Sequence, residues 1–189
     1  MINKQFTLGA LRNNCYIIGD DKTSEIAIID APQGIKPVIE YIKTNNYQVK
    51  YIILTHVHFD HIKGLDNLRA EFPNAKIIVH KDELEDANAD IFVTGGEEIE
   101  LGNVKVKVIF TPGHTKGGIS LLMGDNLFSG DTLFKGTIGR ADLPGGSFHR
   151  LVKYIKKSLM NLPDTTTVWP GHGDKTTIAD ERVDNKYLV

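Results

Sequence analysis

Short apolar runs separated by turn residues open the chain. The runs at 15–18 and 26–29 follow an alternating segment, and together they predict a β meander over residues 4–29. Apolar positions then recur at intervals of three and four over residues 35–42, a spacing that is typical of one face of a helix. This part of the chain therefore predicts strands followed by an amphipathic helix.

The middle of the chain alternates between strand-like and helix-like segments. Continuous apolar runs at 51–54 and 76–79 predict two buried strands, and residues 61–72 between them predict a helix that Pro73 ends. Valines alternate with lysines over residues 104–110, which predicts a strand with one exposed face.

The last third adds strands at 119–123, 127–128 and 165–169, and a helix over residues 148–159 with Ser147 as its N-cap. Strands and helices are therefore mixed along the whole chain. This order predicts an α+β fold in which two β-sheets pack together with helices outside.

The composition is that of an ordinary globular protein. The chain has 189 residues, 41% apolar and 24% charged, and no linker divides it, so we expect a single domain over residues 1–189. A net charge of -2 gives no reason to expect nucleic acid or an anionic membrane as a partner. The single cysteine, Cys15, is expected in the core. Because the first residues lack signal-peptide features and no apolar run reaches the ~20 residues of a membrane span, we expect cytoplasmic residence.

A cluster of metal-ligating residue types follows the strand that ends at Leu54. His56, His58, Asp60 and His61 form the sequence H-x-H-x-D-H. Two imidazoles two residues apart in an extended segment can point at one ion, and the adjacent Asp-His step can serve a second position. The motif predicts a metal site with room for two adjacent metals.

Further ligand-type residues follow four other predicted strands. They are Asp30, His114 in P-G-H-T, Asp131 in S-G-D, and His172 in P-G-H-G. Loops at strand ends converge on one site in many folds, so we expect the last three to join the motif as metal ligands. For Asp30 the sequence is equally compatible with a role as the hydrogen-bond partner of a metal ligand and with a routine turn or cap. His80 and His149 belong to no such constellation and are expected to be structural.

Together these motifs resemble those of the metallo-β-lactamase superfamily along nearly the whole chain. The resemblance implies an αβ/βα four-layer sandwich with two mixed β-sheets and a dinuclear site at one edge. Its motif positions imply one metal held by His56, His58 and His114, a second held by Asp60, His61 and His172, and a bridge formed by Asp131. Asp30 matches the first-motif aspartate of the family.

The stretch GDTLFKGTIGRADLPGG resembles the hydroxyacylglutathione hydrolase (glyoxalase II) branch, in particular its short prokaryotic members. Arg140 falls where those enzymes carry a basic residue for the glutathione carboxylate, but the aromatic residue of their motif is replaced in the region of Asp142. Only 17 residues follow His172, so we expect the C-terminal helical domain to be absent and the KM for the glutathione part to be high. The bridging-type Asp131 disfavours a true β-lactamase, and the absence of a basic arm disfavours a tRNA-processing nuclease.

The implied chemistry is hydrolysis of a small-molecule thioester. Two divalent cations, with zinc favoured and iron or manganese compatible with the ligands, lower the pKa of a shared water so that hydroxide forms near neutral pH. Asp60 is expected to be the catalytic residue that ligates and also accepts the water's proton. A thiol leaves as thiolate without a strong general acid, and the motifs contain no spare acid.

Three alternatives stay open at this point. A lactone or another ester would suit the same scaffold as a substrate. Persulfide dioxygenases share the scaffold and use one iron through the equivalents of His56, His114 and Asp131, so an oxidoreductase is compatible with the ligands. A non-catalytic metal-binding module is the third alternative, although a structural site needs only four ligands. The sequence carries no signal for the oligomeric state.

Overall fold

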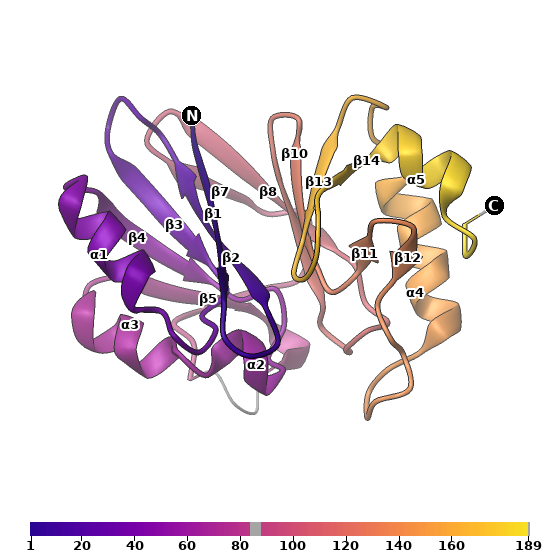
Figure 1. Cartoon of the computed structure of the whole chain (residues 1–189), viewed down its shortest axis with the longest axis horizontal. Helices are drawn as coiled ribbons and strands as arrows, with labels where there is room; N and C mark the ends of the chain where they lie inside the picture. The colour runs from indigo at the N-terminus through magenta and orange to yellow at the C-terminus, as the bar shows by residue number, and fades with distance from the viewer. Residues whose placement is uncertain (84–87, 189) are drawn as a thin grey trace.

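Two six-stranded β-sheets form the centre of the computed structural model, which describes residues 1–83 and 88–188 (Figure 1). The first sheet has the order β1 (Ile2–Leu8), β2 (Asn13–Gly19), β3 (Glu25–Ile29), β4 (Gln48–Ile53), β5 (Lys76–His80), β6 (Ile91–Val93). The second has the order β14 (Thr176–Thr177), β13 (Thr167–Pro170), β10 (Asn126–Gly130), β9 (Ile119–Met123), β8 (Val104–Phe110), β7 (Glu98–Leu101). Each sheet contains both parallel and antiparallel pairs, as expected for a mixed sheet.

Helices cover the outer face of each sheet. The first sheet carries α1 (Lys36–Thr44) and α3 (Leu65–Glu71), and the second carries α4 (Phe148–Tyr154) and α5 (Ile178–Asp184) (Figure 1). The remaining elements are short: α2 (Phe59–Ile62), helical turns at Lys81–Glu83 and Ile155–Leu159, and the hairpin of β11 (Leu133–Phe134) and β12 (Thr137–Ile138). The predicted α+β class and the four-layer sandwich are thereby confirmed.

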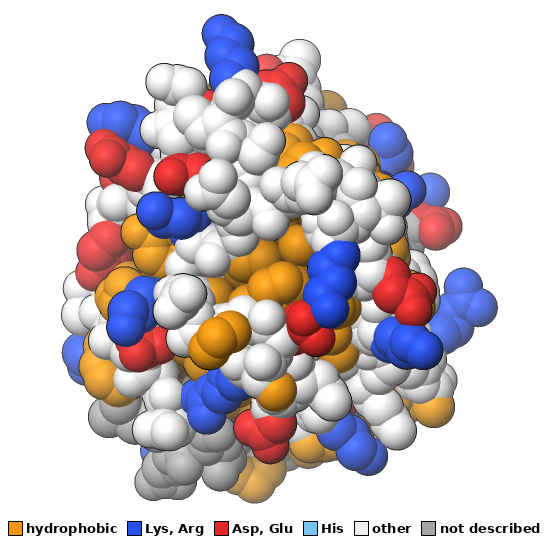
Figure 2. Space-filling view, turned by 90° about the vertical axis from the view of Figure 1, so that its left-hand side faces the viewer, with side chains coloured by type: hydrophobic (Ala, Val, Ile, Leu, Met, Phe, Trp, Pro, Cys, Tyr) orange, Lys and Arg blue, Asp and Glu red, His pale blue; other side chains and the backbone are white. Residues whose placement is uncertain are grey.

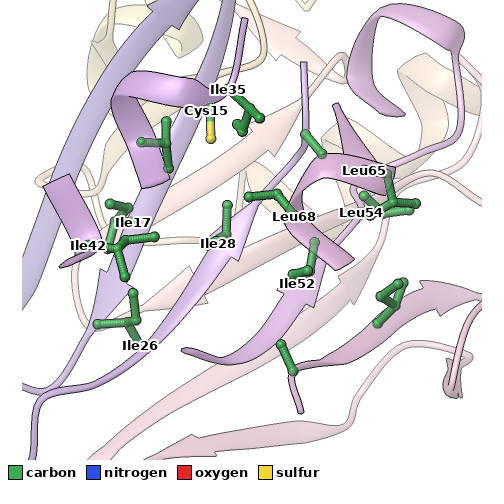
Figure 3. Close-up of a cluster of buried hydrophobic side chains, with 14 of the residues drawn as sticks. Cys15, Ile17, Ile26, Ile28, Ile35, Ile42, Ile52, Leu54, Leu65 and Leu68 are labelled. Atoms are coloured by element: carbon green, nitrogen blue, oxygen red, sulfur yellow. The ribbon is translucent and has the colours of Figure 1, made fainter. Parts of the chain in front are cut away.

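Three apolar clusters hold these layers together. In β3, Ile26 and Ile28 point into the cluster under α1 and α3, whereas Ala27 and Ile29 point into the cluster between the sheets. Figure 3 shows the first cluster, where Cys15 lies among isoleucine and leucine side chains, as expected of a small core residue. The third cluster joins the second sheet to α4 and α5. Strands buried on both faces explain why their sequences are continuous apolar runs.

The outer face over α1 and α3 carries positive and negative side chains interspersed around a small apolar area (Figure 2). In the described part of the chain, no helix is long and apolar enough to cross a membrane.

The helix predicted over residues 61–72 is interrupted. It is divided into α2 and α3, and Gly64 marks the break. The amide of Gly64 donates to the carbonyl of Ala31 at 2.7 Å, and a Cβ at this position would collide with the carbonyl oxygen of Pro32. The neighbouring loop therefore requires glycine here, and glycine interrupts the helix. Ser147 is the N-cap of α4, as predicted, since its Oγ accepts a hydrogen bond from the amide of Arg150.

Strand direction brings several loops to one end of the sandwich. Strands β3, β4 and β5 run parallel, and so do β10 and β13, so each set ends at a common edge. The two edges are tied together where the amide of Asn14 donates to Gly171 at 2.7 Å and the amide of Gly171 donates to Gly130 at 2.8 Å. Helix α2 lies at this end, at the bottom of Figure 1. The loops after these strands are therefore held against one another.

Candidate metal centre

The seven ligand-type side chains predicted from the motifs meet at this end of the sandwich. They fall into three groups whose ligand atoms lie within 4.8 Å of one another: His56, His58 and His114; His56, His61 and Asp131; Asp60, His61 and His172. The first and third groups coincide with the two sets implied by the family resemblance. The intermediate group shares one histidine with each of them.

The first set is three imidazoles from two loops. The ring centroids of His56, His58 and His114 lie 4.5–4.8 Å apart, and the rings stand nearly perpendicular to one another. The Nδ1 atom of His114 donates to the carbonyl of Arg140 at 2.7 Å, so its Nε2 points into the cluster. This arrangement leaves the Nε2 lone pair for a metal ion.

The second set combines two imidazoles with a carboxylate. His61 Nδ1 donates to Asp30 Oδ2 at 2.8 Å, and His172 Nδ1 donates to the carbonyl of Leu11 at 3.0 Å. Asp60 is fixed by Asn13, whose Nδ2 donates to Asp60 Oδ2 at 2.9 Å. Both imidazoles thus have their Nδ1 occupied, and Nε2 again is the ligand atom.

Asp131 lies between the two sets. Its Oδ1 is 3.4 Å from His61 Nε2, while its Oδ2 is 3.5 Å from His114 Nε2 and 3.6 Å from His172 Nε2. A Cβ at Gly171 would collide with Asp131 Oδ1, so the glycine of the second Pro-Gly-His motif is what lets this loop approach. One carboxylate therefore faces both sets, as a bridging ligand must.

Asp30 connects the two sets through hydrogen bonds. Besides binding His61, its carboxylate accepts hydrogen bonds from the amide of Thr55 at 2.8 Å and from the Thr55 hydroxyl at 2.9 Å. That hydroxyl lies 3.0 Å from His56 Nδ1, and because it donates to Asp30 it accepts from the imidazole. Asp30 is buried and has a left-handed backbone with φ of 60°. It orients one histidine of each set, a role beyond a turn residue.

The ionisation of these side chains suits cation ligands. Burial, and then the neighbouring His61, lower the pKa of His56, so its imidazole is neutral. Burial raises the pKa of Asp131, but the neighbouring His61, and then His172 and His114, outweigh it and lower the pKa overall. Burial lowers the pKa of His61, but Asp30 and Asp131 raise it overall, so a metal ion would displace a proton there.

Unpartnered buried atoms show that the cluster fits a cation. His56 Nε2, His61 Nε2, His114 Nε2 and Asp131 Oδ1 are buried without a hydrogen-bond partner, and all four point into the cluster. Leaving a buried polar atom unpaired costs about 1–3 kcal/mol. Four such atoms in one place therefore indicate a site for a shared cation. A nitrogen and carboxylate donor set is compatible with zinc, iron or manganese.

Arg140 lies beside the cluster but is not a free cation. Its carbonyl holds His114, while its guanidinium forms two 2.8 Å hydrogen bonds with the carboxylate of Asp142, and both side chains are exposed. The predicted contact with a substrate carboxylate therefore has to compete with Asp142. His80 lies outside the cluster: its Nδ1 accepts from the amide of Asp82, and its ring stacks on Phe110 at 4.4 Å.

Asn13 and Glu83 are site residues that the sequence analysis missed. Asn13 falls among the turn residues that separate the first apolar runs, although it begins β2 and holds Asp60. Glu83 is buried, with Oε2 accepting from the amide of Val57 at 3.0 Å and Oε1 from the amide of Gly117 at 2.8 Å. It thereby clamps the loop of His56 and His58 to the loop of His114. No local pattern marks either role, because the partners are far away in the sequence.

Loss of the Glu83 clamp is expected to weaken metal binding. In Glu83→Ala the two loops are no longer joined, so the affinity for a divalent metal should fall roughly 10–100-fold, the usual effect of removing a group that orients ligands. Glu97→Ala is the matched control, since Glu97 also accepts from two backbone amides, but in the 94–97 turn. Competition with a chromogenic chelator measures both affinities. Equal affinities in the two variants would contradict the clamp.

Comparison with known proteins indicates the same superfamily that the motifs resemble. The profile described as the Metallo-beta-lactamase superfamily matches residues 8–172. The Bacillus subtilis protein named Probable metallo-hydrolase YqgX is 33% identical, over 98% of this chain and 96% of its own. The Dictyostelium discoideum protein named Glyoxylase B2 is 30% identical, over 91% of this chain and 73% of its own.

Solved structures show the same architecture. The BLEG-1 B3 metallo-beta-lactamase has a TM-score of 0.92 and 33% identity, with both chains fully covered. ETHE1 from Myxococcus xanthus has a TM-score of 0.91 and 31% identity, over 98% of this chain and 84% of its own. TTHA1623 in a di-iron-bound form has a TM-score of 0.86 and 28% identity, over 98% of this chain and 100% of its own. These neighbours differ in name, so the chemistry has to be argued from the site.

Proposed function

Because this chain belongs to the metallo-beta-lactamase superfamily, we propose that it is a metal-dependent hydrolase that cleaves an acyl thioester. One observation carries the proposal: a single carboxylate, Asp131, lies within 3.6 Å of ligand nitrogens from both three-residue sets. That arrangement suits a two-ion site.

The residues divide into two ion-holding sets. His56, His58 and His114 would hold one divalent ion, Asp60, His61 and His172 the other, and Asp131 would contact both. When bound, such ions supply Lewis-acid chemistry: they lower the pKa of water and polarise a carbonyl oxygen. Zinc is the metal we favour, and iron or manganese fit the same donors.

Asp60 is the group that we assign to proton acceptance. Burial raises its pKa, but the neighbouring His172 and the hydrogen bond from Asn13 lower it overall, so the carboxylate is ionised at neutral pH. Asn13 fixes one of its oxygens at 2.9 Å. The side chain thus stays in place beside both His61 and His172, where an attacking water would lose its proton.

The leaving group is the reason to favour a thioester. In the described part of the chain, the carboxylates of the cluster are ionised or already hydrogen-bonded to histidine, so none is assigned as a general acid. A thiol with a pKa of ~8.5 leaves as thiolate without such help, whereas an alkoxide does not. The relative named Glyoxylase B2 supports the same choice, and Arg140 beside His114 is compatible with a carboxylate on the substrate.

A parallel assay tests this proposal. We expect the metal-loaded protein to cleave S-lactoylglutathione, followed by the loss of thioester absorbance, with no change in dissolved oxygen. Two further substrates are measured alongside. The first is glutathione persulfide, and the second is a chromogenic cephalosporin, included because of the neighbour named a B3 metallo-beta-lactamase. Oxygen uptake with the persulfide, or cephalosporin cleavage without thioester cleavage, would overturn the thioester assignment.

A further inference from the structure

An open pocket of about 870 Å³ begins at His58 and extends away from the metal cluster. Its wall is built from four segments: the loops at 57–58 and 115–116, the helical turn at Lys81–Glu83, and residues 144–150, which lead into α4. The volume is in the range of small-molecule sites. A substrate whose carbonyl lies at the cluster can therefore extend into this pocket.

The pocket is lined by an excess of positive charge. Lys81, Lys116 and Arg150 are the cations, and Asp82 pairs with Lys81 at 2.7 Å. In Glu83, the other acid, both carboxylate oxygens accept hydrogen bonds from backbone amides. Within residues 1–83 and 88–188, Lys116 and Arg150 form no side-chain hydrogen bond or ion pair, so no described carboxylate is paired with either of these two positive charges.

The backbone positions of both cations are fixed relative to His114. Lys116 follows that histidine by two residues on the same loop, and the amide of Ser147 donates to the carbonyl of Gly113 at 2.7 Å. A Cβ at Gly113 would collide with the backbone of Leu151, so the first turn of α4, which carries Arg150, packs directly against this loop. The fold therefore sets the distance from the cluster to the two backbone positions from which these cations extend.

The surroundings of the second metal set are different. Leu11, whose carbonyl accepts from His172, is 53% exposed. An exposed apolar residue beside one set and cations beside the other give the site two chemically distinct sides. A substrate with one apolar and one anionic end would bind in one direction.

We propose that the pocket formed by Lys81, Lys116 and Arg150 binds an anionic group on the thiol carrier of the thioester, with the acyl group toward Leu11. This inference rests on the proposed thioester hydrolysis and adds the substrate class, thioesters of acidic thiols. Carboxylates and phosphates share the required chemistry. A charge-assisted contact with a cation orients the carrier before the carbonyl reacts.

The test compares anionic and neutral thioesters in the metal-loaded protein. In the double variant Lys116→Gln/Arg150→Gln, we expect kcat/KM for S-lactoylglutathione to fall roughly 10–100-fold, through KM, the scale of lost charge-assisted contacts. A neutral thioester such as S-ethyl thioacetate should change less than about twofold. Added salt should weaken wild-type turnover of the anionic substrate, and weaken it less in the variant. An acyl-coenzyme A substrate distinguishes phosphate from carboxylate carriers.

Lys157→Gln is the control variant, because this exposed lysine follows α4 but does not line the pocket. Equal losses on neutral and anionic thioesters, or no loss on either anionic one, would overturn the pocket assignment. If the wild type cleaves no thioester, the proposed function fails instead. Binding of S-methylglutathione and coenzyme A, measured by calorimetry, then decides on the pocket alone: unchanged affinity in the double variant for both would overturn it.

Discussion

Replacement of Asp131 by alanine is expected to lower kcat/KM on the order of a thousandfold while the protein stays folded. The carboxylate is the only side chain of the described cluster that faces both three-residue sets, at 3.4–3.6 Å from three histidine nitrogens. Its removal would leave the two ions without a common ligand, and interactions at the reacting centre contribute several kcal/mol each. Asp131 belongs to none of the three apolar clusters, so the core is unaffected.

His149→Ala is the matched control for this prediction. His149 is exposed near the start of α4, and we expect its loss to change kcat/KM less than about twofold. Kinetics on the preferred substrate, far-ultraviolet circular dichroism and metal content are measured for both variants. If both lose turnover equally with unchanged dichroism, the division into ligands and bystanders is wrong.

Much of the fold could be predicted because its long elements carry periodic signals. The strands with Ile26 to Ile29 and Tyr51 to Ile53 are continuous apolar runs, and their burial between two apolar clusters explains why. Strands β6, β11, β12 and β14 have only two or three residues, too few to show a period. The break at Gly64 is imposed by the carbonyl of Pro32, a tertiary contact that no local pattern contains.

The residues of the candidate site also fall into those that the sequence predicts and those that depend on tertiary contacts. The seven ligand-type residues could be found because they occur at strand ends in recognisable motifs. Asn13 and Glu83 could not, because their functions depend on how β2 meets α2 and how residue 83 meets two distant loops. The role of Arg140 as a substrate contact stays a prediction, and its pairing with Asp142 depends on side-chain geometry that the sequence does not specify.

Removal of the metal is expected to abolish activity and to lower thermal stability together. Without a cation, four buried ligand atoms have no hydrogen-bond partner, so binding should favour the folded state strongly. A metal present at about 100 times its Kd adds about 2.7 kcal/mol, which corresponds to a Tm increase of roughly 5–10 °C for a chain of this size. Chelated protein should therefore melt earlier and regain activity on addition of metal.

The number of metal ions needed for activity distinguishes a two-ion hydrolase from a mononuclear oxygenase. Because the two three-residue sets share Asp131, we expect full activity and full thermal stability only after two equivalents of divalent metal per chain. Elemental analysis of protein purified without chelator, combined with stepwise titration of the chelated form, measures this number. Saturation at a single equivalent of iron, with oxygen uptake on a persulfide, would contradict the two-ion hydrolase and favour a mononuclear oxygenase. Saturation at two equivalents, together with thioester cleavage, would support the role of Asp131 as a ligand that both ions would share.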